Sequence, residues 1–192
     1  MKTFLKAAAL AATALTATVS VTAPVHAQTA QAQIVIVDMD EVIGTSAAGK
    51  GAQAVLQGQA NGLQARVKTL TDGFQKEEDA LRTQVQNKTI AQPALEAKLK
   101  DLQSRKQSAE SEIGGRQRTL QQSQSYVVKQ IDEAAQPIIT AIMKERGASI
   151  ALASGATVQI ANALDITAEV VKRLNVAKPS VSTTPPAQTQ SK

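Results

Sequence analysis

The sequence lacks most of the side chains that enzymes use for catalysis. Its 192 residues include no cysteine or tryptophan, one histidine, one tyrosine and two phenylalanines. Without cysteine there are no disulfides and no thiolate chemistry. The one histidine, His26, lies in a segment that we expect to be removed, which excludes histidine dyads and histidine metal sites from the mature chain. We therefore expect no enzyme, no cofactor and no bound metal.

The N-terminus has the pattern of a secretory signal. Lys2 and Lys6 give a positive start, residues 7–21 are small and apolar, and Val25-His26-Ala27 offers small residues where a signal peptidase reads them. We predict cleavage after Ala27 and export, because the apolar run is too short and too rich in alanine and threonine for a membrane anchor. Because Lys2 and Lys6 leave with the signal, the net charge falls from +5 to +3, which is mildly basic and argues against nucleic acid as a partner.

The central part of the chain, residues 47–146, predicts two long antiparallel helices. Apolar residues recur there at a 4–3 spacing, which is the seam of a coiled coil. Asn87 to Pro93 interrupts the pattern with residues that end one helix and begin the next. The seam residues are Leu56, Ala60, Leu63, Val67, Leu70, Phe74, Leu81, Val85, Leu95, Leu99, Leu102, Ala109, Ile113, Leu120, Val127 and Ala134.

The residues before these helices predict a strand and a short helix. Ile34 to Val37 are all β-branched, as in a buried strand. Asp38 to Ile43 carries acidic residues at a helix start, and Ser46 suits the N-cap of the first long helix. The long helices end at Gly147.

The residues after the long helices predict a β-hairpin, a helix and a tail. Residues 149–153 and 157–161 alternate around a short turn and predict two paired strands. Residues 165–175 predict an amphipathic helix. Residues 176–192 are rich in proline, serine, threonine and glutamine and predict disorder.

These elements predict an α+β fold. Residues 28–46 and 147–175 form a small β-core, with one strand before the long helices and a hairpin after them. A three-stranded sheet of this kind exposes its edges, and the apolar core is thin. Both features favour subunits that share one core.

One motif resembles an active site. Val37-Asp38-Met39-Asp40 is similar to the first motif of haloacid-dehalogenase phosphatases, in which the first aspartate is the nucleophile. Such enzymes need further parallel strands and a downstream acidic pair, whereas about a hundred helical residues follow here. We favour a buried strand followed by an acidic helix start.

The helical arm carries the candidate binding residues. Between Lys50 and Arg146 there are 15 basic and 11 acidic residues, and Lys106 and Arg116 fall on seam positions that prefer apolar side chains. A loosened, basic inner face suits unfolded polypeptides and anionic lipid headgroups. The predicted hinge residues are Gly62, Gly114, Gly115 and Pro137. The predicted binding residues are Arg66, Lys68, Phe74, Lys98, Lys100, Arg105, Lys106, Arg116 and Arg118.

Two stretches, Ile34-Val35-Ile36-Val37-Asp38-Met39 and the closing run from Ala163 to Leu174 around Asp165-Ile166-Thr167, resemble the Skp/OmpH family of periplasmic chaperones. The resemblance implies a homotrimer whose helical arms enclose unfolded outer-membrane β-barrel proteins without ATP. It also implies a periplasmic location and, in some members, contact with lipopolysaccharide. A structural coiled-coil spacer of the cell envelope is the alternative.

Overall fold

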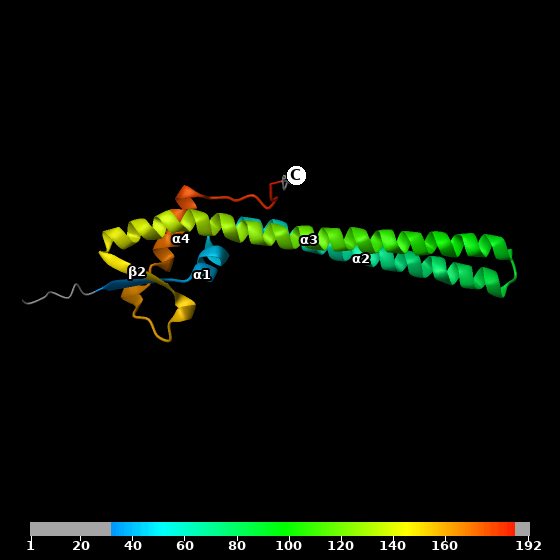
Figure 1. Ribbon diagram of the computed structural model, residues 1–192, viewed down its shortest axis with the longest axis horizontal. Helices are drawn as coiled ribbons and strands as arrows, with labels where there is room; N and C mark the ends of the chain where they lie inside the picture. Colours follow the sequence, from blue (N-terminus) through cyan, green and yellow to red (C-terminus); the bar gives the residue numbers. More distant parts are fainter. Residues whose placement is uncertain (1–31, 187–192) are drawn as a thin grey trace, which may run out of the picture. The chain divides into compact units, whose positions relative to one another are not determined.

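The computed structural model describes residues 32–186, so the predicted signal segment lies outside the described residues. In the described part, no helix is both long and apolar enough to span a bilayer. Two long helices, α2 (Ala47–Gln86) and α3 (Gln92–Glu145), lie between the elements of a small body. Figure 1 shows these two helices side by side.

The sheet of the body contains two parallel strands, β1 (Gln33–Val37) and β2 (Ala148–Ala153). Both strands were predicted from the sequence. The predicted partner strand at 157–161 is wrong, because the chain turns into a 3₁₀ helix, Ser154–Ala156. The Ser154 carbonyl accepts both the Thr157 amide (3.0 Å) and the Thr157 hydroxyl (2.8 Å), which directs the chain away from β2. Of the alternating apolar residues that follow, Val158 is fully exposed and Ile160 is only partly buried.

Local capping sets the junction between β1 and α2. Asp38 precedes the short helix α1 (Met39–Thr45), and its Oδ1 accepts the Glu41 amide at 2.9 Å. Ser46 then caps α2, as predicted, by accepting the Gly49 amide at 3.1 Å. A Cβ on Gly49 would lie 1.6 Å from the Ile43 carbonyl oxygen, so only glycine fits this junction.

The helical hairpin agrees with the sequence prediction. The turn spans the residues between α2 and α3 and contains Lys88 at φ 53°, and Pro93 lies in the first turn of α3. The 40 residues of α2 extend over about 60 Å at ~1.5 Å per residue. The α3 helix continues through Pro137 and ends before Gly147, whose φ of +63° is a conformation that glycine adopts readily.

The apolar core lies in the body. Side chains from β1, α1, the start of α2, the C-terminal part of α3 and the closing helix α4 (Thr167–Ala177) pack together there, and from here on the body includes these two helix ends. The amide of Ile166 donates to the Ile36 carbonyl at 2.9 Å, which attaches the start of α4 to β1. The core residues include Val35, Val37, Val42, Ala48, Ala52, Val127, Ile131, Ala135, Ile142, Ile166, Val170 and Leu174.

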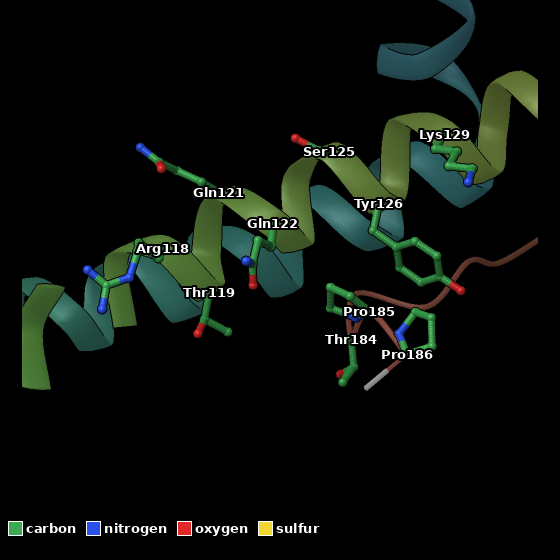
Figure 2. A pocket seen from close by; sticks show the side chains of 10 residues that line it. All are labelled: Arg118, Thr119, Gln121, Gln122, Ser125, Tyr126, Lys129, Thr184, Pro185 and Pro186. Carbon is green, nitrogen blue, oxygen red and sulfur yellow. The ribbon is translucent and has the colours of Figure 1, made fainter. Parts of the chain in front are cut away.

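The segment after α4 differs from the sequence prediction of a tail that is disordered from residue 176. Helix α4 extends through Ala177, and residues 178–186 follow a defined path. Val181 packs against the core, and the side chain of Gln130 forms hydrogen bonds with the backbone of Ser182. Figure 2 shows the last part of this path, where Pro185 and Pro186 lie beside Tyr126 of α3.

Candidate functional site

The middle of the helical arm is less tightly packed than either of its ends. Leu81 and Leu102 are buried near the turn, and burial resumes at Ser123 toward the body. Between these points, no residue of 53–80 in α2 or 103–122 in α3 is buried. We call these two stretches the mid-arm. Its seam residues, such as Leu63 and Ile113, are only half-buried, so the two helices make contact there without a closed core.

Shallow hollows lie along the mid-arm. One, of about 540 Å³, is lined by Leu63, Val67 and Ile113 together with polar side chains. A second, of about 520 Å³, includes Phe74 and Lys106. A surface that mixes apolar and polar groups in this way can make many weak contacts with an extended polypeptide and needs no fixed ligand shape.

Ion pairs between α2 and α3 flank the hollows. The Arg66 Nη2 lies 2.9 Å from the Glu112 Oε2, and the Arg105 Nη1 lies 2.9 Å from the Glu77 Oε1. Lys106 pairs with Glu78 and lies 5.9 Å from the centre of the Phe74 ring. Lys106, a basic residue at a seam position, therefore links the two helices, whereas the sequence predicts that it loosens them.

The paired carboxyls have altered acidity. The hydrogen bond from Arg66 lowers the pKa of Glu112, and a second bond from Arg116 adds to this effect. Likewise, the hydrogen bond from Arg105 lowers the pKa of Glu77. These groups are exposed to solvent, which weakens the attraction between them, so the pairs orient the helices more than they stabilise them.

Of the nine predicted binding residues, Phe74 lines a hollow with Lys106, and the eight basic ones fall into two groups. Arg66, Arg105 and Lys106 pair with the opposite helix, while Lys68 and Arg116 pair within their own helix with Asp72 (2.8 Å) and Glu112 (2.9 Å). The remaining three basic residues of the predicted set form no ion pair within residues 32–186, and Lys98 donates to the Gln84 side-chain oxygen at 3.3 Å. Those residues are Lys98, Lys100 and Arg118.

The predicted hinge glycines are not required by packing. A Cβ on Gly62 or Gly115 would meet nothing within 4 Å, and on Gly114 only the Arg118 Nη1, at 3.7 Å. Gly62 and Gly115 line one hollow of about 650 Å³, so they lie at the same height on the arm. Packing therefore does not explain these glycines, and their hinge role stays a prediction. Pro137 lies within the continuous α3, and its hinge role stays a prediction.

The acidic motif has a structural role. The Asp38 carboxylate caps α1, and the Asp38 amide donates to the Thr167 hydroxyl at 2.9 Å. Over residues 32–186, no three acidic or histidine side chains are grouped closely enough to hold a metal ion. These contacts favour the capped helix start over the phosphatase alternative.

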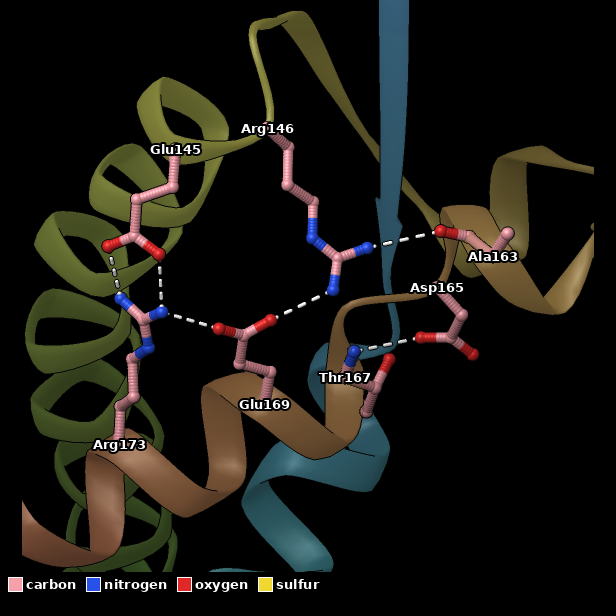
Figure 3. A network of polar contacts seen from close by, with 7 residues as sticks. All are labelled: Glu145, Arg146, Ala163, Asp165, Thr167, Glu169 and Arg173. Atoms are coloured by element: carbon pink, nitrogen blue, oxygen red, sulfur yellow. Dashed lines mark hydrogen bonds and ion pairs between the residues drawn. The ribbon is translucent and has the colours of Figure 1, made fainter.

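A network of charged residues, which was not predicted from the sequence, joins α4 to the end of α3. Arg173 of α4 donates to Glu169 and to Glu145 (2.8 Å), and Arg146 donates to Glu169 (2.8 Å) and to the Ala163 carbonyl (3.1 Å), as Figure 3 shows. The hydrogen bonds from Arg146 and then Arg173 lower the pKa of Glu169. The Glu169–Arg173 spacing on one helix was visible in the sequence, whereas its partners on α3 become neighbours only in the fold.

The comparisons with known proteins agree with this architecture. No curated protein sequence matches the chain. A crystal structure from Caulobacter crescentus CB15, described as an OmpH-like outer membrane chaperone, superposes with a TM-score of 0.73 at 22% identity, over 84% of this chain and 95% of that one. The model of the family "Outer membrane protein (OmpH-like)" matches residues 33–174. The chain therefore belongs to the OmpH-like family.

Proposed function

We propose that this protein is an ATP-independent holdase chaperone of the periplasm, which binds unfolded outer-membrane β-barrel proteins between helical arms and prevents their aggregation. The mid-arm carries the proposal, because it offers mixed apolar and polar hollows without a closed core in a chain of this family. The description of the Caulobacter crescentus structure as an outer membrane chaperone supports the same function.

A homotrimer is the proposed form of the protein, with the bodies of three copies packed together. In the described chain, β2 pairs with β1 alone, which leaves its other edge without a strand partner. Ile150, Val158 and Leu164 are exposed nearby in sequence, and a shared core would cover such side chains. Light scattering on the mature protein should give the mass of three chains. A monomeric mass would contradict the shared core.

The holdase function predicts protection at stoichiometric amounts. A β-barrel protein unfolded in urea and diluted into buffer aggregates, and turbidity follows that process. We expect one trimer per client to keep the turbidity at its starting value. A cytosolic coiled-coil protein of similar length serves as the control. Aggregation at an unchanged rate would contradict the proposal.

A structural spacer of the envelope is the second candidate. The ion pairs that join α2 to α3, such as Arg66–Glu112, favour it because they suit a fixed arm. A spacer holds one partner and does not protect an unfolded client, so the same turbidity measurement separates the two functions. The unpaired Lys98, Lys100 and Arg118 are the residues at which we expect anionic lipid or lipopolysaccharide to make contact.

A further inference from the structure

The segment after α4 lies outside the part of the chain that matches the family. The family model ends at residue 174, whereas the described chain continues to residue 186. Residues 178–186 contain no helix or strand. They nevertheless contact α3 in two places, at Gln130 and around Tyr126.

The first contact is a clamp on the backbone. The Gln130 Nε2 donates to the Ser182 carbonyl at 2.7 Å, and the Ser182 amide donates to the Gln130 Oε1 at 3.1 Å. The same Nε2 also donates to the Tyr126 carbonyl at 3.2 Å, which holds the amide group in place. One side chain thus binds both backbone groups of one residue, as a neighbouring β-strand would. Such a clamp is independent of the side chain that the bound residue carries.

The second contact is a hollow beside an aromatic ring. Tyr126, Thr184, Pro185 and Pro186 line a space of about 810 Å³. Figure 2 shows the tyrosine ring beside the two prolines. Proline restricts φ before binding, so an extended proline-containing segment loses little entropy when it docks on an aromatic surface. The Ser182 hydroxyl accepts the Thr184 amide at 3.1 Å and shapes the chain just before the prolines.

We propose that the face of α3 around Tyr126 and Gln130, here called the α3 peptide site, binds extended, proline-containing polypeptide. In the free protein its occupant is the chain's own residues 181–186, and a segment of an unfolded client displaces them. The displacement by a client rests on the proposed function, whereas the occupation by the chain's own segment does not. The free chain would then cover this surface until a client arrives.

The NMR signals of the Tyr126 ring can report whether the α3 peptide site is occupied. Tyr126 is the only tyrosine, so a mature chain with carbon-13 in its tyrosine ring gives one set of ring signals. Gln130→Ala removes both hydrogen bonds of the clamp, whereas Ser182→Pro removes the one that the Ser182 amide donates and keeps the Ser182 carbonyl. We expect both variants to shift the Tyr126 signals in the same direction. The ratio of docked to free segment should fall by roughly tenfold in Gln130→Ala, where two hydrogen bonds are lost, and by less in Ser182→Pro, where one is lost.

The control is Gln103→Ala, because Gln103 is exposed on the same helix and makes no side-chain hydrogen bond in the described part of the chain. Its Tyr126 signals should match the wild type. Ser182→Pro lies outside the helices and the core, so it tests the clamp even if Gln130→Ala perturbs α3. Wild-type signals in both clamp variants would overturn the proposal.

A separate peptide can then be used to occupy the α3 peptide site. A synthetic peptide of residues 178–192 contains no aromatic residue. Added to Ser182→Pro, it should return the Tyr126 signals to their wild-type position, and an absence of any shift would overturn the peptide site. This result does not depend on the chaperone function.

Unlabelled β-barrel protein, diluted from urea into the labelled wild type, tests displacement. We expect the Tyr126 signals to move away from the docked position as the client is held. A client that stays soluble while those signals remain unchanged overturns displacement and leaves the proposed function intact. A client that aggregates contradicts the proposed function, while the peptide experiment still decides the site.

Discussion

The body and the mid-arm use similar apolar residues but bury them to very different extents. Val42, Ile131, Ile142 and Leu174 of the body have no exposed surface. In the mid-arm, Val67 is 40% exposed, and no residue of that region is buried. The hydrophobic free energy is therefore concentrated in the body, while the mid-arm keeps apolar surface available for other contacts. A holdase needs this division, since its scaffold must persist while its binding surface adapts.

The largest expected effect is on the free energy of unfolding, which tests directly whether the body is more tightly packed than the mid-arm. Ile142→Ala leaves a cavity in the body and should lower the free energy of unfolding by about 2–5 kcal/mol. Ile113→Ala removes a half-buried side chain from the mid-arm and should cost about half as much or less, because less surface is re-exposed. Urea unfolding followed by circular dichroism measures both. Equal losses would mean that the mid-arm is as tightly packed as the body.

Glycine-to-alanine substitutions give the second test, because they should lower stability in the body and raise it in the mid-arm. Gly49→Ala places a Cβ against the Ile43 carbonyl and should destabilise the body by ~1–3 kcal/mol. Gly62→Ala meets no neighbour and should stabilise the arm by ~1 kcal/mol. If the arm bends there to hold a client, the stabilised variant should also protect a urea-diluted β-barrel protein less well. Full protection by a stiffer arm would contradict the hinge.

Much of the fold could be predicted because its signals are local. The caps at Asp38 and Ser46, the turn before Pro93 and the stop at Gly147 each follow from the chemistry of a few neighbouring residues. The arm followed from periodicity, which identifies a seam but not how closely the seam is packed.

The missed features depend on residues that are far apart in the sequence. Arg66 and Glu112 are separated by 46 positions, and their pairing requires the register that the turn sets. A shared sheet of β1 and β2 across the arm was predicted, but the third strand expected at 157–161 is absent there, because alternation alone does not show whether a segment has a partner. The defined path of residues 178–186 depends on Gln130, which no compositional rule associates with a proline-rich tail.

Acid should have a smaller effect, and it should destabilise the mid-arm more than the body. In the arm, Arg66 and Arg105 hold the pKa values of Glu112 and Glu77 below the ordinary 4.5. A carboxyl with a lowered folded pKa contributes its stability above about pH 4.5 and loses it as the pH falls through the folded value. The body also has such pairs, but it retains its apolar core in acid.

The measurement for acid is hydrogen exchange at neutral pH and at pH values below 4.5, expressed as protection factors. Amides of the mid-arm should lose protection before those of α4, and Glu112→Gln should make the loss at the mid-arm less dependent on pH. Parallel loss of protection in both regions would contradict the difference in packing.

Salt should have the smallest effect, and this effect is on client capture. Most basic residues of the mid-arm already have acidic partners. Screening at about 1 M salt shortens charge attraction to ~3 Å, so client capture should weaken only modestly compared with low salt. The double variant Lys100→Gln, Arg118→Gln should remove most of that dependence, since neither residue is paired. Arg66→Gln is the matched control, because its charge already pairs with Glu112. Capture that is identical in low and high salt would mean that clients are held by apolar contacts alone.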